Sequence, residues 1–380
     1  MSDWSSDVLI VGGGIQGCAI ALYLARAGRR VVVIDKGMAG RQASGVNAGG
    51  LRLLLRDVRE YPLSRRAMEL WADLPMLAGK AAQRCEVRLG TGQIAVAMDA
   101  AEWAWCQARA ADMRRLGFEN EVLLDSRAVR GLLPGLSDSA LGGLISHGDG
   151  HANPAASARA FRDAAIAAGA RVVEHCALQG LDQRADGRWV IHTSHGQFTA
   201  AQVVNCAGAW GAEVAAMMGD ILPLEVLALS MMVTSRVQPF VTPVVIGIDR
   251  PLSFKQSAAG SLVIGGGIAG KACLAESTSF TVMDRMMASA AATIEAFPAL
   301  ASVSILRTWT GLEGKTPDGI PYIGASLSHT GLWHVFGFCG HGFQLAPAVG
   351  EAVARALMTG AAEPMLAPFG MSRFAQRDAA

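Results

Sequence analysis

Val8-Leu-Ile-Val-Gly-Gly-Gly-Ile-Gln-Gly17 has the spacing G-x-G-x-x-G, with glycines at positions 12, 14 and 17. Such a loop binds a dinucleotide when a buried strand precedes it and a helix follows it, because free N–H groups at the helix N-terminus contact the pyrophosphate. Residues 8–11 are apolar enough for a buried strand, and residues 18–28 carry a helical apolar stripe that ends at a glycine. The flanking residues therefore predict a dinucleotide-binding strand–loop–helix unit.

A second strand completes this unit. Arg30-Val-Val-Val-Ile-Asp35 is typical of a buried strand that ends in an acid. The acid follows the glycine loop by about 20 residues, the distance at which a carboxylate binds the ribose hydroxyls of a dinucleotide. Asp35 is therefore a predicted ribose ligand; the alternative is a turn residue at the strand end.

A second glycine run, Leu262-Val-Ile-Gly-Gly-Gly-Ile-Ala-Gly270, has the same spacing. Residues 271–280 after it form no clear amphipathic helix and lead to no strand that ends in an acid. We therefore predict that this second run is a strand end or bulge that binds no cofactor.

Composition limits the classes of function. The chain has 380 residues, of which 51% are hydrophobic and 17% charged, enough for two domains with well-filled cores. Its net charge of +1 arises from 33 basic and 32 acidic residues spread along the chain. This distribution predicts no basic face and therefore no nucleic-acid partner.

The cysteines predict a reducing compartment. There are seven, with no C-x-x-C pair, and an odd number argues against a disulfide framework. No spacing of ligands predicts a metal site. The residues before Val8 include no basic region, so we expect no signal peptide, and no run of 18 apolar residues predicts a membrane span. We expect a cytoplasmic protein, with peripheral docking on a membrane left open.

Four further segments distinguish a flavin enzyme from a nicotinamide enzyme. Residues 44–52 form a loop of small residues that lets the backbone lie against a ligand, and residues 200–210 predict a strand that ends in small residues and a tryptophan. Residues 316–324 are followed by residues 332–347, which place glycines and His341 ahead of a predicted helix. The positive N-terminal end of that helix could face an electron-rich ring.

With these segments the sequence resembles the FAD-dependent superfamily of D-amino-acid oxidase, glycine oxidase and sarcosine oxidase. The matching motifs are Gly12-x-Gly14-x-x-Gly17, Asn205-Cys-Ala-Gly-Ala-Trp210, Thr316-Pro-Asp318 through Gly324, and Gly340-His-Gly-Phe343. The resemblance implies an α/β fold with a β-rich insert. A discontinuous Rossmann-like FAD-binding domain would comprise residues 1–80, 145–215 and 310–380, and a sheet-based substrate domain residues 81–144 and 216–309.

The resemblance also implies which residues contact FAD. They belong to the glycine-rich segments above and to one strand between them: Gly12, Gly14, Ile15, Gln16, Gly17, Asp35, Lys36, Ser44, Asn47, Ala48, Gly49, Gly50, Leu51, Val173, Cys206, Ala207, Gly208, Trp210, Gly311, Gly340, His341, Gly342, Phe343 and Gln344. No cysteine near Gly311 is available for covalent attachment, so non-covalent FAD is expected.

Within the superfamily, Asn47-Ala-Gly-Gly-Leu-Arg52 and Trp309-Thr-Gly-Leu-Glu-Gly-Lys-Thr-Pro-Asp318 look most like the catalytic β-subunit-like branch. That branch contains sarcosine, opine, D-hydroxyproline and proline dehydrogenases or oxidases. Glu313 stands where glycine oxidases carry an arginine for the substrate carboxylate, and Val263 where oxidases carry an oxygen-activating lysine. A dehydrogenase that passes electrons to an α-subunit-like partner with further cofactors is therefore expected.

Three residues are candidates for catalysis. Arg52 would pair with a substrate carboxylate or lie beside the flavin ring, unless it forms a surface salt bridge. Glu313 would bind a second, cationic group of an opine-like substrate or cap a turn. His341 would hydrogen-bond in the flavin loop rather than act as a base, and Lys255 and Gln256 are weaker candidates.

Several alternatives remain open from the sequence. Relatives of the heterotetrameric sarcosine oxidase type attach FMN to a histidine in the region of Gly150-His-Ala-Asn-Pro154, where this chain has Asn153 with His151 nearby. Covalent FMN is therefore not expected, and FMN bound at the boundary between two subunits is left open. The chain could also be a self-sufficient oxidase that releases peroxide, a nicotinamide enzyme, or a non-catalytic flavoprotein assembly subunit.

Overall fold

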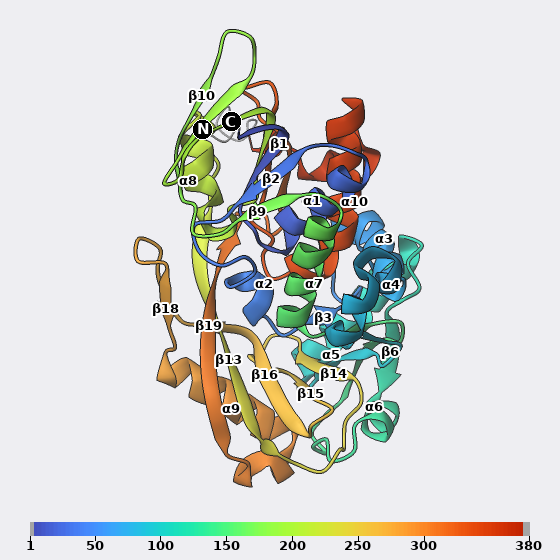
Figure 1. The fold of residues 1–380 in the computed structure, drawn as a ribbon. Helices are drawn as coiled ribbons and strands as arrows, with labels where there is room; N and C mark the ends of the chain where they lie inside the picture. Colours follow the sequence, from blue (N-terminus) through green and yellow to red (C-terminus); the bar gives the residue numbers. More distant parts are fainter. Residues whose placement is uncertain (1–3, 375–380) are drawn as a thin grey trace.

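The predicted βαβ unit is present in the computed structural model, which describes residues 4–374 (Figure 1). β1 (Ser5–Val11) pairs in parallel with β2 (Val31–Ile34), and α1 (Ile15–Arg26) connects them. Gly12, with φ +110°, makes the turn after β1; a Cβ there would lie 2.3 Å from the carbonyl oxygen of Cys206. The turn therefore requires glycine for both its conformation and its close approach to the chain that follows β12 (Gly196–Asn205).

The first sheet has the strand order β10-β11-β12-β1-β2-β9, and β21 pairs with both β12 and β20. Its remaining strands are β9 (Arg171–Val173), β10 (Leu178–Gln183), β11 (Trp189–Thr193), β12 (Gly196–Asn205), β20 (Tyr322–Ala325) and β21 (Leu332–Phe336). β9, β2, β1, β12 and β21 run parallel, so their carboxyl ends meet at one edge. Ligands of open α/β sheets bind at this edge.

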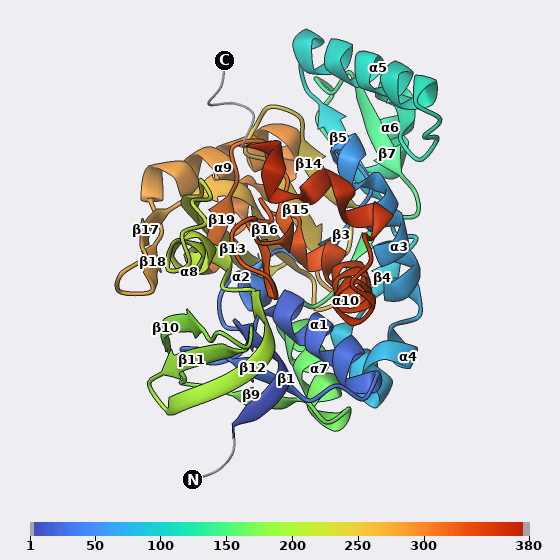
Figure 2. The same ribbon diagram turned by 90° about the horizontal axis from the view of Figure 1, so that it is seen from above.

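Helices cover one face of this sheet (Figure 2). They are α1, α7 (Pro154–Ala167) and α10 (Gly342–Thr359); α3 (Tyr61–Ala72) packs on α10 and α4 (Leu74–Ala78) on α7. Val8 and Ile10 of β1 point into the core beneath them, whereas Leu9 and Val11 point into a second core beneath β10 and β11. Burial on both faces explains why β1 is a continuous apolar run.

The second sheet has the order β19-β13-β16-β15-β14-β5-β7-β6. Its strands are β5 (Gln93–Ala97), β6 (Val122–Asp125), β7 (Gly142–Ser146), β13 (Glu225–Arg236), β14 (Val244–Gly247), β15 (Ser253–Gln256), β16 (Ser261–Ala269) and β19 (Ile305–Lys315). The second glycine run lies in β16, which confirms its prediction as strand. One face of this sheet packs against α9 (Met283–Ala296) through Phe254, Ile264 and neighbouring apolar residues.

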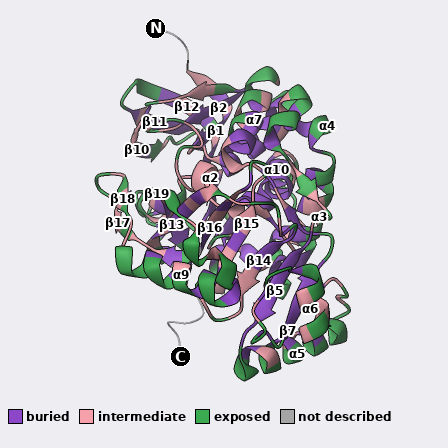
Figure 3. Cartoon of the chain, turned by 90° about the horizontal axis from the view of Figure 1, so that it is seen from below, coloured by how far each residue is buried: buried purple, intermediate pink, exposed green. Residues whose placement is uncertain are grey.

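The remaining helices and strands include a three-stranded sheet, β3-β8-β4, and a two-stranded sheet, β17-β18. They are α2 (Ala43–Val46), β3 (Gly50–Leu51), β4 (Arg88–Leu89), α5 (Ala100–Arg115), α6 (Ser126–Leu132), β8 (Gly150–His151), α8 (Gly211–Ala216), β17 (Lys271–Cys273) and β18 (Thr278–Phe280). The central strands are buried, and the outer surfaces of α5 and α9 are exposed (Figure 3).

The architecture confirms the predicted fold class, a Rossmann-like unit with a separate sheet. The residue boundaries proposed for the domains stay a prediction. Within residues 4–374, no helix combines the length and the apolar character needed to cross a bilayer.

Candidate active site

A cavity of about 1240 Å³ lies between the carboxyl ends of β1, β2 and β12 and the face of the second sheet that turns away from α9. It brings together most of the predicted cofactor residues: Gly12, Gly14, Ile15, Gln16, Asp35, Lys36, Ser44, Asn47, Ala48, Gly50, Cys206, Ala207, Gly208, Trp210, Gly311, Gly340, His341, Gly342 and Phe343. The catalytic candidates Arg52, Glu313 and His341 line the same cavity. Segments separated by hundreds of residues thus share one surface.

Five predicted cofactor residues do not line the cavity and lie behind the residues that do. A Cβ on Gly17 would lie 2.1 Å from the carbonyl oxygen of Gly12, so its role in this structure is close packing of α1 on the loop. Gly49 and Leu51 belong to the buried side of the loop, and the carbonyl of Val173 accepts a hydrogen bond from Asp35 N. Gln344 is buried and bonds to Ser64 and Arg56.

The glycine loop has a geometry that fits a dinucleotide. Gly14 is the N-cap residue of α1, no acid occupies the first turn, and the loop faces the cavity. Ser44 Oγ accepts a hydrogen bond of 3.0 Å from Ile15 N, so the loop at residues 44–52 lies directly against the helix N-terminus. Helix N-terminal N–H groups in this position favour a phosphate. The residues present therefore fit the pyrophosphate of FAD.

Asp35 has backbone partners of its own in this structure. Its Oδ2 accepts a hydrogen bond from Gly13 N and its Oδ1 one from Gly37 N, each 2.8 Å long. These bonds fix the end of β2 beside the glycine loop. Next to it, the ammonium of Lys36 lies 3.4 Å from the ring centroid of Trp210, a cation–π contact that joins β2 to the turn after β12.

We call the cavity-facing residues of the second sheet the floor: Leu227, Leu229, Met231, Lys255, Val263, Gly311 and Glu313. The pairing of the strands places these side chains on the same face of the sheet. The directly opposite pairs are Glu313 with Leu227, Gly311 with Leu229, and Lys255 with Val263. Directly opposite residues of paired strands point to the same side of a sheet.

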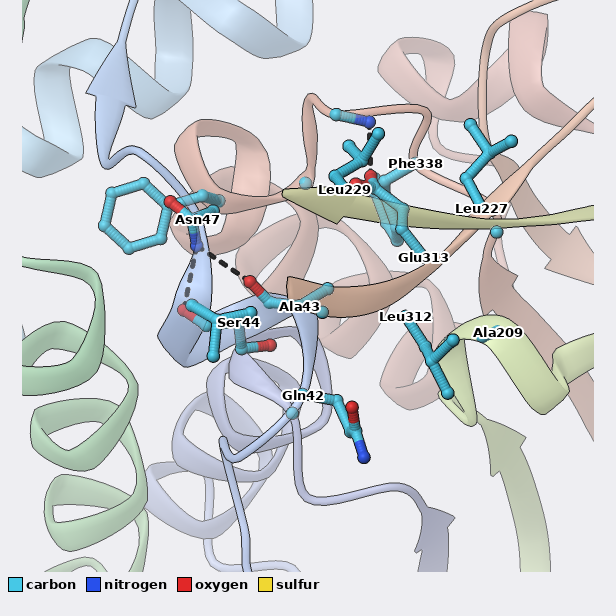
Figure 4. A pocket seen from close by; sticks show the side chains of 18 of the residues that line it. Gln42, Ala43, Ser44, Asn47, Ala209, Leu227, Leu229, Leu312, Glu313 and Phe338 are labelled. Carbon is cyan, nitrogen blue, oxygen red and sulfur yellow. Dashed lines mark hydrogen bonds between the residues drawn. The ribbon is translucent and has the colours of Figure 1, made fainter. Parts of the chain in front are cut away.

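Glu313 lies on the floor among apolar side chains. Figure 4 shows it beside Leu229 and Phe338. One carboxylate oxygen accepts a hydrogen bond from the backbone N–H of Gly340, in the loop before α10. Burial raises the pKa of Glu313, and that hydrogen bond partly offsets the rise.

Lys255 extends from β15 into the same cavity. Its ammonium donates a 3.0 Å hydrogen bond to the carbonyl of Ala152, and burial lowers its pKa to about 8. Gln256, the other weak candidate, bonds to the backbone of Phe240 and Gly260 and does not line the cavity. Strand alternation separates the two side chains, since neighbouring residues point to opposite faces.

A buried cluster at the wall of the cavity joins Arg56, Glu60 and His341, of which Arg56 and His341 line the cavity. Arg56 and Glu60 are 1% and 0% exposed. Glu60 Oε2 lies 2.9 Å from His341 Nδ1 and 3.8 Å from Arg56 Nη1. Arg56 Nη2 also donates to Gln344 Oε1 at 3.2 Å.

Burial dominates the electrostatics of this cluster. Burial, with the nearby Arg52 second, lowers the pKa of Arg56 to about 9. Burial, with Arg56 second, also lowers the pKa of His341 to about 4, so the imidazole is neutral near pH 7. Burial alone would raise the pKa of Glu60, but His341 and the two guanidiniums outweigh it and lower the pKa.

Sequence reasoning missed Arg56 and Glu60. The available signal was a charge at every fourth position, 52, 56 and 60, although Asp57 and Arg59 between them are charged as well. Residues with that spacing can act together, but the spacing does not reveal the contact with His341, which is 281 positions away from Glu60.

In the region considered for FMN, Asn153 is hydrogen-bonded within the chain and His151 lies in a strand. Asn153 Oδ1 accepts a 3.1 Å hydrogen bond from Ala156 N and thereby caps α7. His151 lies in β8, where burial lowers its pKa to about 4.

Known proteins resemble the whole chain. The beta subunit of sarcosine oxidase from Rhizobium meliloti (strain 1021) is 31% identical, over 97% of this chain and 88% of that protein. Glycine oxidase of Geobacillus kaustophilus (strain HTA426) and an opine oxidase subunit of Rhizobium meliloti are each 28% identical, over 97% of both chains. The crystal structure of L-proline dehydrogenase from P. horikoshii superposes with a TM-score of 0.89 at 26% identity, over 98% of this chain and 99% of that one.

A family model also matches the chain, and its description names the cofactor. Residues 7–356 match the model of the DAO family, described as FAD dependent oxidoreductase, and this range includes the glycine loop, both sheets and the floor of the cavity. The chain therefore belongs to the DAO family of FAD-dependent oxidoreductases.

Proposed function

We propose that this oxidoreductase oxidises the carbon–nitrogen bond of an amino acid or secondary amine of the opine, D-hydroxyproline, sarcosine or proline type, as the catalytic subunit of a heteromeric dehydrogenase. Bound FAD supplies, at its N5, the acceptor for the hydride that leaves the carbon, and water then hydrolyses the imine. The observation that carries the proposal is one cavity lined by the predicted FAD loops together with Arg52, Lys255 and Glu313.

The residues of the cavity would bind and orient the substrate. Arg52 and Lys255 are cations whose pKa values burial lowers, so a carboxylate that binds between them compensates part of that burial. The apolar floor, with Leu229, Met231 and Val263, excludes water from the reacting carbon. No base from the chain is required, because a neutral amine releases hydride directly.

The visible spectrum of the purified protein tests this proposal. Under anaerobic conditions, D- and L-proline derivatives, sarcosine, glycine and opines are added one at a time. Bleaching of the flavin band by one of them identifies the substrate. An intact flavin band with every compound, in the presence of the copurified partner as well, would instead indicate a non-catalytic assembly subunit.

The partner subunit is supported by the names of two relatives, each described as one subunit of an oxidase, and by the apolar Val263. We expect substrate-reduced isolated chain to be reoxidised slowly by oxygen and rapidly by the coexpressed partner. The released flavins of the coexpressed complex would show whether FMN accompanies FAD. Rapid reoxidation by oxygen alone contradicts a dehydrogenase.

Lys255 favours a second candidate function, a self-sufficient oxidase that releases hydrogen peroxide. Lys255 is directly opposite Val263, so the neighbouring strand brings a positive charge to the same side of the sheet. A fixed cation in a dry site stabilises the negative charge that develops as oxygen is reduced. Stoichiometric peroxide release by the isolated chain would establish this alternative.

A further inference from the structure

Glu313 is an acidic side chain on an otherwise apolar part of the floor. Its cross-strand neighbour is Leu227, and Leu229 and Phe338 lie next to it (Figure 4). One carboxylate oxygen accepts a hydrogen bond from Gly340 N, which leaves the second oxygen for the cavity.

No cation of the protein neutralises this carboxylate. Within residues 4–374, no lysine, arginine or histidine nitrogen lies within 4.0 Å of Glu313, and the groups that shift its pKa are its own burial and the N–H of Gly340. Lys315, two residues further along β19, points to Glu225 at the exposed end of the sheet. Glu313 is half-buried, and its apolar surroundings disfavour a carboxylate that has no cationic partner, so a positively charged ligand group would stabilise it.

Two lysines of this sheet line the cavity: Lys315 is paired with Glu225, and Lys255 lies across the sheet from Glu313. Lys255 is on β15, and the strand order β19-β13-β16-β15 puts three strand intervals between it and Glu313. At about 4.8 Å for each interval this is roughly 14 Å across the sheet. The register adds a separation along the strands, because Lys255 is level with Arg307, six residues before Glu313 on β19. The cavity therefore has a positive side at Lys255 and a separate negative site at Glu313.

We propose that Glu313 binds a second, cationic group of the substrate, an ammonium or guanidinium remote from the carboxylate held at the positive side. This inference rests on the proposed function, since it names the substrate class for the same cavity. The bound group is not the nitrogen that is oxidised, because an ammonium paired with a carboxylate keeps its proton and cannot release hydride from the neighbouring carbon. Small amino acids without a second cation, such as glycine and sarcosine, are then poor substrates.

Matched probes test the inference on the FAD-loaded protein. Arginine and N2-(1-carboxyethyl)arginine carry a guanidinium, and citrulline and N2-(1-carboxyethyl)citrulline carry the isosteric neutral urea. Dissociation constants are measured anaerobically from the change that each probe causes in the flavin absorption band. We expect the guanidinium compounds to bind roughly 10- to 100-fold more tightly than their urea partners, the range for a charge-assisted hydrogen bond.

Two variants separate the charge from the shape of the side chain. Glu313→Gln keeps the acceptor for Gly340 N and removes the charge, so the preference for guanidinium should disappear; Glu313→Arg should reverse it. Glu225→Gln removes the same charge from an exposed position outside the cavity and should leave the preference unchanged. FAD content, measured for each variant, verifies an intact cofactor site.

The outcomes distinguish this inference from the proposed function. Equal binding of guanidinium and urea compounds, or a preference that persists in Glu313→Gln, overturns the role of Glu313 even if another amine bleaches the flavin. A preference that Glu313→Gln abolishes, combined with a flavin that no amine bleaches, supports Glu313 as a cation site and contradicts amine oxidation.

Discussion

Burial lowers the pKa values of three cations of the cavity region, Arg52, Arg56 and Lys255. Glu60 lies within ion-pair distance of Arg56, so that guanidinium has a buried counter-ion inside the protein. Arg52 donates to the carbonyl of Leu54, and Lys255 donates to that of Ala152. These two therefore keep charge available for a ligand, whereas Arg56 serves mainly to hold the cluster at the wall of the cavity.

Removing Arg56 should destabilise the protein strongly. Arg56→Met leaves the fully buried Glu60 without its guanidinium, and breaking one side of a buried pair costs about 3–5 kcal/mol. The measurement is urea unfolding with saturating FAD. Arg115→Met, which breaks the exposed pair with Asp112, should change the free energy of unfolding by less than about 1 kcal/mol. Equal effects of the two substitutions would show that the Arg56 pair contributes no more than a surface pair.

Lys255 should make ligand binding depend on pH. Its pKa of about 8 is below the ordinary value of 10.5, so the ammonium is charged below pH 8 and becomes neutral as the pH rises. The affinity for a carboxylate inhibitor should therefore be constant below about pH 8 and fall above it. Spectral titration of the flavin across this range measures the effect.

Lys255→Met should bind the same inhibitor more weakly at pH 7 and lose the fall above pH 8. Lys80 is exposed and lies outside the cavity, so Lys80→Met is the matched control and should retain the profile of the parent protein. An unchanged profile in Lys255→Met would assign the pH dependence to another group.

At the scale of the elements, the two glycine runs have the same spacing and different surroundings. The first follows β1 and begins α1, whereas the second is part of β16. In β16, a Cβ on Gly265 would lie 2.0 Å from Sδ of Met231 on the neighbouring strand. Packing between strands therefore explains a glycine at this position without a nucleotide.

Alanine substitutions in the two runs should have opposite effects on FAD. Gly12→Ala places a Cβ against the backbone of Cys206 in a left-handed conformation, so the loop must move and FAD content should be lost. Gly265→Ala meets the flexible end of Met231 and should retain FAD. The ratio of flavin to protein after purification measures both. Loss of FAD from Gly265→Ala alone would contradict this assignment and place the nucleotide at the second glycine run.

At the scale of the molecule, the cavity is formed by both sheets, so a bound cofactor contacts both parts of the fold. Residues from β1, from the turn after β12 and from β19 meet there although they are far apart in the chain. Binding of FAD to the native state alone raises the free energy of unfolding by about 2.7 kcal/mol at a hundredfold excess over the dissociation constant. The assembly of the two sheets should therefore be linked to FAD.

FAD should be dissociable. Gly311, with its neighbours on β19, offers no thiol to the flavin, so acid precipitation should leave all flavin in the supernatant. The apoprotein should melt at a lower temperature, and added FAD should restore the original melting temperature. A yellow pellet would reveal a covalent bond and contradict this expectation.

The sequence by itself determined the βαβ unit and the choice between the two glycine runs, and its resemblance to a known family indicated the loops that line the cavity. The first two are local properties, because the identity of residues 8–35 sets a strand, a turn and a helix before any distant contact forms. Gly17, Val173 and Gln344 show the limit of prediction from the sequence. Their segments were predicted to form the cofactor site, but the sequence did not reveal that these three residues lie behind the surface of the cavity.

Only the tertiary structure decided which side chains share a surface. Val263 suggested a floor without a cation, but the register of β15 on β16 places Lys255 directly opposite it. Glu60 meets His341 because α10 packs against α3, and Glu313 reaches Gly340 because β19 ends beside the loop before α10. Strand register and helix packing depend on cores formed by the whole chain, and spacing along the sequence contains no measure of them.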